Sequence, residues 1–363
     1  MKKTILAIAI VTASAGAMAT QCGGGYCGNP GIPSTSSVSA SISGGVGVGP
    51  GTAGGSAIMS SGTTAGTYTV SGAKAAGAEI CNNGVVGAAS GSAALGYTGS
   101  YAVGHVSGAA GGYNSASSNF AASTSAGQSA EAGDLSAGAN TTAAVNGGSG
   151  AVVTGTGAAV SGGITAAGSL AGSAGATTDV GYYNKQNTEY VWIVPVKGHT
   201  TKGETETSNV MLGSVSGSGS LAGSYATGDA NSAAGVDSNT TGAASVDVAT
   251  PYTSASGSVD SGASSMAESG WGGNGAAGSG AFAGSAGEMS AYNTRSEEYD
   301  WKLSWGKVKE YNHSSSEYSN VTGKDVKIVG ADKFEVGNGN ADMAAGTNIQ
   351  LNGTAGNVQE QAQ

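Results

Sequence analysis

The sequence predicts an all-β protein with an elongated, repetitive architecture rich in Gly, Ser and Ala, either a solenoid or a stack of sheets, with aromatic strand modules. Three observations support this fold class. The 67 glycines among 363 residues oppose helix, by about 1 kcal/mol each relative to alanine. Large apolar residues alternate with polar ones in the charged segments, which is the period of a strand. Blocks of sequence also recur at long, similar offsets. The alternative is a largely disordered chain with β islands.

Residues 1–19 have the organisation of a signal peptide. Lys2 and Lys3 precede an apolar run, and Ala17–Ala19 supplies a small-x-small cleavage site. This arrangement resembles the Sec signals of Gram-negative bacteria, which implies a bacterial or phage chain that is secreted to the cell surface or medium. Periplasmic residence is the alternative location.

The mature chain is acidic. Without Lys2 and Lys3, 13 − 2 = 11 basic residues face 23 acidic ones, for a net charge of −12. This balance opposes binding to nucleic acid and to anionic lipid headgroups. No apolar run after the signal is long enough to span a membrane.

All three cysteines lie in the N-terminal region 20–81. Cys22 and Cys27 are separated by Gly23, Gly24, Gly25 and Tyr26, and the glycines permit the tight loop that a local disulfide needs. An exported chain meets an oxidising compartment, so we expect Cys22 and Cys27 to pair. Cys81 is then either a free thiol or a link between two chains.

The rest of the chain alternates in composition. Small-residue tracts with few charges span 82–181 and 212–290, and each is followed by a module rich in charges and aromatics, 182–211 and 291–336. Residues 337–363 read as a C-terminal tail. The chain is therefore predicted to contain two copies of one unit.

Specific matches support this duplication. Tyr183-Asn184 recurs as Tyr292-Asn293, and Glu189-Tyr190-x-Trp192 recurs as Glu298-Tyr299-x-Trp301, both at an offset of 292 − 183 = 298 − 189 = 109 residues. These matches use rare residues. Two further matches lie in the tracts and keep the same order: Gly99–Gly104 with Gly223–Gly228, and Ser169–Gly175 with Ala281–Gly287.

The aromatic modules are predicted to be strands. Their large side chains occupy alternate positions, and the candidate residues are Tyr190, Trp192, Tyr299, Trp301 and Trp305. One interpretation is that these rings pack inward and form the ordered core of a small sheet. The other is that they form an exposed row that stacks on sugar rings. Pro195 lacks a backbone donor, so the first strand is expected to end there or to lie at an edge.

The small-residue tracts allow two interpretations. Sheets faced with Gly, Ala and Ser can stack closely, but tiny side chains return little hydrophobic free energy against the cost of ordering the backbone. The tracts are therefore either laterally repeated strands or a flexible polymer between ordered aromatic islands. In the second case, small-residue substitutions within 135–178 would cost far less stability than truncation of Trp301.

No arrangement of residues predicts catalysis. His105, His199 and His313 are far apart in sequence and lie in polar or Gly-rich surroundings. No motif indicates a phosphate loop, and the candidate calcium loop at 237–248 lacks its final Glu. We expect no enzyme activity, no cofactor and no metal.

The sequence thus favours a secreted, non-enzymatic structural protein that forms or decorates an extracellular assembly, such as a matrix, fibre, surface layer or phage appendage. Its expected partner is a second copy of itself, in a homo-oligomer or fibre. The alternative is a surface adhesin whose aromatic modules bind a glycan or a host surface.

Overall fold

The computed structural model describes residues 35–47, 55–80, 83–108, 113–179, 183–191, 194–270, 274–304 and 307–355. All regular elements in these ranges are β-strands, which confirms the predicted all-β class. No helix occurs in them, so none of the described segments is a helical membrane span. The strands are β1 (Thr35–Gly47), β2 (Gly55–Ile80), β3 (Asn83–Gly108), β4 (Asn114–Ala132), β5 (Leu135–Asp179), β6 (Tyr183–Val191), β7 (Val194–Ala249), β8 (Thr253–Ser269), β9 (Gly275–Ser304), β10 (Lys307–Gly337) and β11 (Gly339–Ala355).

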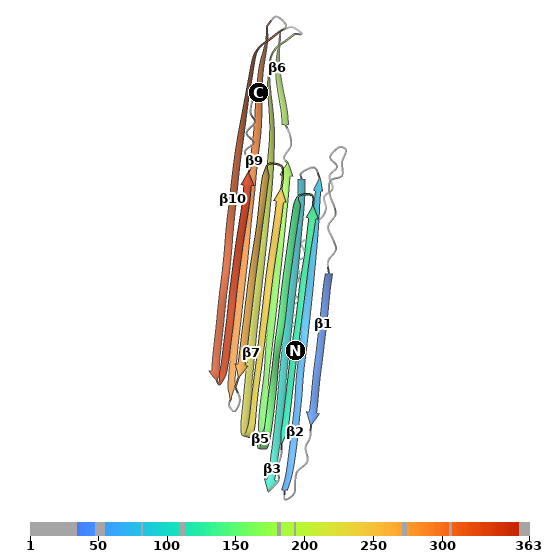
Figure 1. The fold of residues 1–363 in the computed structure, drawn as a ribbon, viewed down its shortest axis with the longest axis vertical. Coiled ribbons are helices and arrows are strands. Elements are labelled where there is room, and N and C mark those ends of the chain that lie inside the picture. Colours follow the sequence, from blue (N-terminus) through green and yellow to red (C-terminus); the bar gives the residue numbers. More distant parts are fainter. Residues whose placement is uncertain are drawn as a thin grey trace.

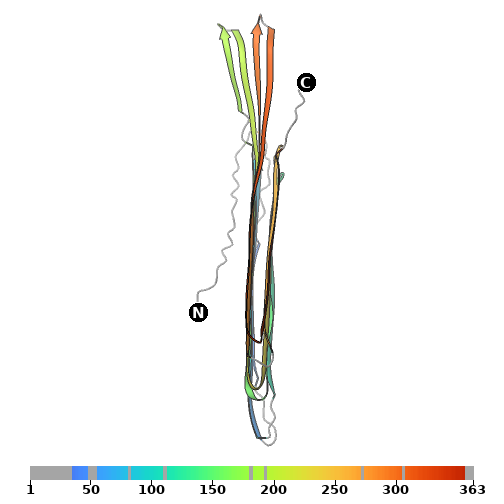
Figure 2. The same ribbon diagram turned by 90° about the vertical axis from the view of Figure 1, so that its left-hand side faces the viewer.

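The strands form one open antiparallel sheet that folds over on itself into two layers (Figures 1 and 2). β5 and β7 each run through both layers. Layer A contains, in order, β1, β2, β3, residues 157–179 of β5, residues 194–228 of β7, β9 and β10. Layer B contains β4, residues 135–153 of β5, residues 230–249 of β7, β8 and β11. The result is a long, flat slab; β9 alone, with 30 residues, extends for about 100 Å.

The chain crosses between the layers at one end of the slab. Two of these crossings depend on glycines with left-handed backbone: Gly228 (φ 64°) in β7, and Gly337 (φ 69°) at the end of β10. A Cβ on Gly228 would collide with the carbonyl oxygen of Thr156, and one on Gly337 with that of Asn274. Only glycine fits both the conformation and the space.

The core between the layers consists of small residues. Its main clusters contain Ala, Val and a few larger side chains such as Leu135 and Phe120. In β4 and β8, for example, buried positions alternate with more exposed ones. The small-residue tracts therefore form the ordered core of the described chain. The alternative interpretation, a flexible polymer between ordered aromatic islands, is wrong for these residues.

Serine and threonine hydroxyls bridge the two layers. Ser261 in layer B lies 2.6 Å from the hydroxyl of Ser214 and 2.9 Å from that of Ser216, and all three are buried. Elsewhere hydroxyls donate directly to backbone carbonyls of the facing layer, as from Ser220 to Ser265 (3.0 Å) and from Ser173 to Gly138 (3.0 Å). A serine side chain is short, so these bonds require the layers to lie close together. Tiny side chains make that spacing possible, and the hydroxyl bonds add to the small hydrophobic gain.

Several local expectations change in the structure. The strand predicted around Tyr190 is the tip of a hairpin, because β6 ends at Val191, β7 begins at Val194, and Tyr190 pairs with Pro195. Most of the region assigned to a C-terminal tail is ordered, because residues 339–355 form β11, which pairs with β8.

Layer A is longer than layer B. Layer B turns back at residues 250–252, where the backbone N–H of Tyr252 donates to the Glu206 carboxylate at 3.0 Å. Beyond this level, the β6–β7 hairpin and the β9–β10 hairpin continue as a single layer at the top of Figure 1. We call this single-layer part of the two hairpins the projection. It contains the described residues of both aromatic modules that lie near the hairpin tips.

Candidate functional site

Only part of the predicted site set lies in the described residues. Cys22, Cys27 and Cys81 lie outside them, as do Trp192 and Trp305. Tyr190, Tyr299 and Trp301 are described, and all three lie in the projecting hairpins.

Trp301 and Tyr299 lie on one face of the projection. They are on the same side of β9 as the buried Ala291 and Asn293, which face layer B, but they lie beyond the level at which layer B ends. Register places Trp301 opposite Gly198 of β7, and the indole occupies the space that a Cβ on Gly198 would need. One side of this ring is therefore covered by backbone, while no strand of layer B covers the other.

Tyr299 is fixed by two polar contacts. Its hydroxyl donates a hydrogen bond to the Glu297 carboxylate. The Nζ of Lys202 lies 5.2 Å from the ring centroid, within the range of a cation–π contact. Tyr190 is 62% exposed at the tip of the other hairpin. The core clusters of the described residues are made mainly by Ala and Val, and none of these three rings belongs to them.

The projection also brings together groups that sequence reasoning treats as isolated. Nδ1 of His199 lies 2.7 Å from a carboxylate oxygen of Asp300, and the Thr201 hydroxyl lies 3.0 Å from Nε2. The three groups are linked in the same order as in a nucleophilic triad, in which a hydroxyl contacts an imidazole and the imidazole contacts a carboxylate. The His199 and Asp300 side chains are 44% and 52% exposed on the surface of two paired strands, where water screens their charges. We interpret the cluster as a cross-strand contact that joins β7 to β9. No local sequence pattern predicts the contact between His199 and Asp300, since the two residues are 101 positions apart in the sequence.

The carboxyl group of Glu79 has a raised pKa. Burial raises the pKa of Glu79, and the neighbouring charge of Asp134 raises it further, against a backbone hydrogen bond that lowers it. The carboxylate lies against the turn at Gly133, where φ is 58°. Its position, between the end of β2 and the β4–β5 turn, indicates a structural contact between the layers.

The two broad faces of the slab differ sharply in chemistry. Large apolar side chains point outward from layer A, in rows that cross the strands. One row is Tyr101, Val160 and Tyr225, which are 38%, 51% and 53% exposed and lie directly opposite one another in register. Ile164 and Leu221 form the next. We call this outer surface of layer A the apolar face.

The outer surface of layer B is polar and acidic, and we call it the acidic face. Its described strands contain no Lys or Arg. Six carboxylates are exposed on them: Glu131, Asp237, Asp247, Asp260, Glu268 and Asp342.

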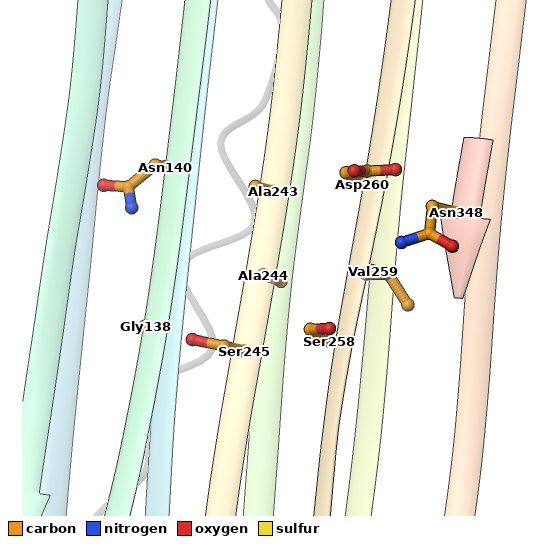
Figure 3. Close-up of a pocket in the computed structure, with 9 residues that line it drawn as sticks. All are labelled: Gly138, Asn140, Ala243, Ala244, Ser245, Ser258, Val259, Asp260 and Asn348. Carbon is orange, nitrogen blue, oxygen red and sulfur yellow. The ribbon is translucent and has the colours of Figure 1, made fainter. Parts of the chain in front are cut away.

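A shallow groove of about 170 Å³ crosses the acidic face (Figure 3). Asn140, Asp260 and Asn348 line it from three different strands, with Ala243 between the first two. Among the described residues no group of three or more His, Cys, Asp and Glu side chains is placed to hold a metal ion. The groove offers amide and carboxylate oxygens to water and small polar groups.

No protein-family model and no curated protein matches this chain.

Proposed function

We propose that the mature chain is a secreted, non-enzymatic structural protein that associates with copies of itself to form or decorate an extracellular assembly. The observation that carries this proposal is the construction of the core. Most of the described chain forms one long slab whose two layers are joined by buried hydroxyls and small side chains. A long slab in which nearly every described residue belongs to a strand suits a structural subunit of a larger assembly.

The edges of the sheet support self-association. In the described chain, β4 pairs only with β5 and β11 only with β8. Each of these layer B edges carries a single charged residue, Glu131 and Asp342. Open edges with so few charges are templates for strand addition. The layer A edge formed by β10 is different, because Lys and Asp or Glu recur along it, and charges on an edge strand oppose addition.

The glycines at the crossings are consistent with the predicted duplication. Gly228 and Gly337 occupy equivalent places, each at the end of a layer A strand that runs into a crossing. They are 337 − 228 = 109 residues apart, the same offset as the Tyr-Asn match. A repeated unit explains how a long slab is built from one pattern, with each unit covering its neighbour.

Electron microscopy and analytical ultracentrifugation of the mature chain, starting at Thr20, test this proposal. We expect elongated particles that associate into larger bodies as concentration rises, with a β-type circular dichroism spectrum. A chain that stays monomeric at all concentrations, alone and with the surface fraction of its source cells, would contradict the structural role.

The adhesin function remains a second candidate because of one observation: the ring of Trp301 is uncovered by layer B on one side. A sugar ring could stack there. Glycan-array binding that is lost in Trp301→Ala, but kept in Tyr190→Ala, would support it. Equal binding by both variants and the wild type would argue against a site at Trp301.

A further inference from the structure

We propose that the apolar face is the contact surface of a face-to-face pair of two copies of this chain. This inference deepens the proposed structural role and rests on it: it names the partner, a second copy, and the surface of layer A that meets it.

The area of the apolar face matches what a stable pair needs. More than ten large apolar side chains on the described strands of this face are about one-third to two-thirds exposed. Half of the area of an aromatic side chain is about 75–125 Å², and the aliphatic side chains are somewhat smaller, so ten half-exposed side chains amount to roughly 800 Å², the area that one partner contributes to a standard protein interface. Monomeric proteins rarely leave so large an apolar patch in water.

The arrangement of these side chains suits a copy of the same surface. Ile164 and Leu221 are 46% and 45% exposed and lie side by side on neighbouring strands. Leu221 is followed across the sheet by Gly278, over which the ring of Phe334 lies. The row of large side chains therefore continues across the sheet from Ile164 and Leu221 to the ring of Phe334. In a two-fold pair each patch meets the same patch of its partner, so these rows can pack against each other.

Charge decides which face is used and limits the number of layers. The acidic face carries carboxylates without a base in its described strands, so two acidic faces repel each other. The mature chain, with a net charge of −12 (11 − 23 from its sequence), is also repelled by anionic lipid surfaces. A second copy that docks through its apolar face covers the exposed rings and leaves both acidic faces in water. The assembly is then a pair of slabs rather than an endless stack.

Sedimentation of the full mature chain under reducing conditions tests the pair, since reduction removes any link through cysteine. The test variant is Ile164→Lys, which places a charge at the centre of the contact. Ile164→Leu is the conservative variant. Asn239→Lys puts the same charge on an exposed position of the acidic face and is the matched control. Circular dichroism checks that all three variants fold.

We expect a reversible dimer in the wild type, a rise in its dissociation constant of at least about tenfold in Ile164→Lys, and no such rise in the other two variants. Association in the wild type that Ile164→Lys leaves unchanged would overturn the face-to-face pair while leaving the structural role intact. A wild type that never associates would overturn both. Capture of the monomer by phosphatidylcholine vesicles, at the expense of the dimer, would also overturn the pair and identify a lipid surface as the occupant.

Discussion

Replacing Ala277 with leucine tests whether the two layers are as close as the buried hydroxyls require. Ala277 is on β9, has no exposed surface, and belongs to a cluster with Ala267 of layer B and Ala341. Leucine adds three carbon atoms at a position where the facing side chains are themselves alanines. Either the leucine is forced into a strained rotamer or the layers separate locally.

Both outcomes have a cost that the structure allows us to estimate. Three hydroxyls near Ala277 donate across the layers: Ser279 to the carbonyl of Met266 (2.6 Å), Ser220 to that of Ser265 (3.0 Å) and Ser224 to that of Gly270 (3.4 Å). Separation would break these bonds, at about 1 kcal/mol each. Overpacking without separation costs about 1–3 kcal/mol. We therefore expect Ala277→Leu to lower the free energy of unfolding by about 2–3 kcal/mol.

Urea unfolding, followed by circular dichroism, measures this change as a fall in the midpoint at constant slope. The matched control is Ala344→Leu on β11, because Ala344 points outward on the acidic face and is exposed. The control should change stability by no more than about 0.5 kcal/mol. Equal midpoints for both variants would refute the close spacing of the layers and, with it, the account of the core.

Three further changes probe the hydroxyl bridges between the layers, the chain crossings and the Glu79 carboxyl. Ser261→Ala removes the partner of two buried hydroxyls and should cost about 1–3 kcal/mol in urea unfolding, whereas Ser264→Ala, on the outer side of the same strand, should cost under about 0.5 kcal/mol. Gly228→Ala should cost at least about 1 kcal/mol because of its positive φ and the facing carbonyl, while Gly330→Ala, with nothing nearby to collide with, should be neutral or stabilising. The raised pKa of Glu79 means that the folded chain holds this proton more tightly than the unfolded chain, so stability should fall as pH rises through the range just above 4.5. Thermal unfolding of Glu79→Gln should lack that fall and exceed the wild type at pH 7; an identical pH profile would contradict the assignment.

The sequence allows the fold class to be predicted but not the direction in which side chains point. In the segment 157–175, Val160, Ile164 and Leu170 share one parity, and Ser161 and Thr165 share the other. The usual rule places the large apolar set inside. The structure does the reverse, since the valine, isoleucine and leucine are exposed and the hydroxyls are buried. Period-two alternation identifies the strand, but it cannot say which face is covered when both faces lack charge.

The site could be predicted only in part, for a related reason. The rare residues Tyr299 and Trp301 are correctly placed on strands, because alternation and composition are local properties. Their neighbours depend on register, which pairs Trp301 with Gly198 and Asp300 with His199 over about a hundred residues. Tracts of Gly, Ala and Ser contain few distinctive cross-strand pairs, so register in them is weakly specified by sequence.

The inverted placement of side chains follows from the hydroxyl bridges. Interlayer bonds such as that from Ser220 to the Ser265 carbonyl hold the layers at a spacing that Ala and Ser can fill but that few larger side chains can enter. Once the layers are this close, residues such as Ile164 and Tyr225 fit only on the outside. An exposed apolar surface is then the physical consequence of the core and not an accident of composition. The face-to-face pair proposed above would bury this surface, and the assembly would then gain the hydrophobic free energy that the narrow core of one chain leaves unused.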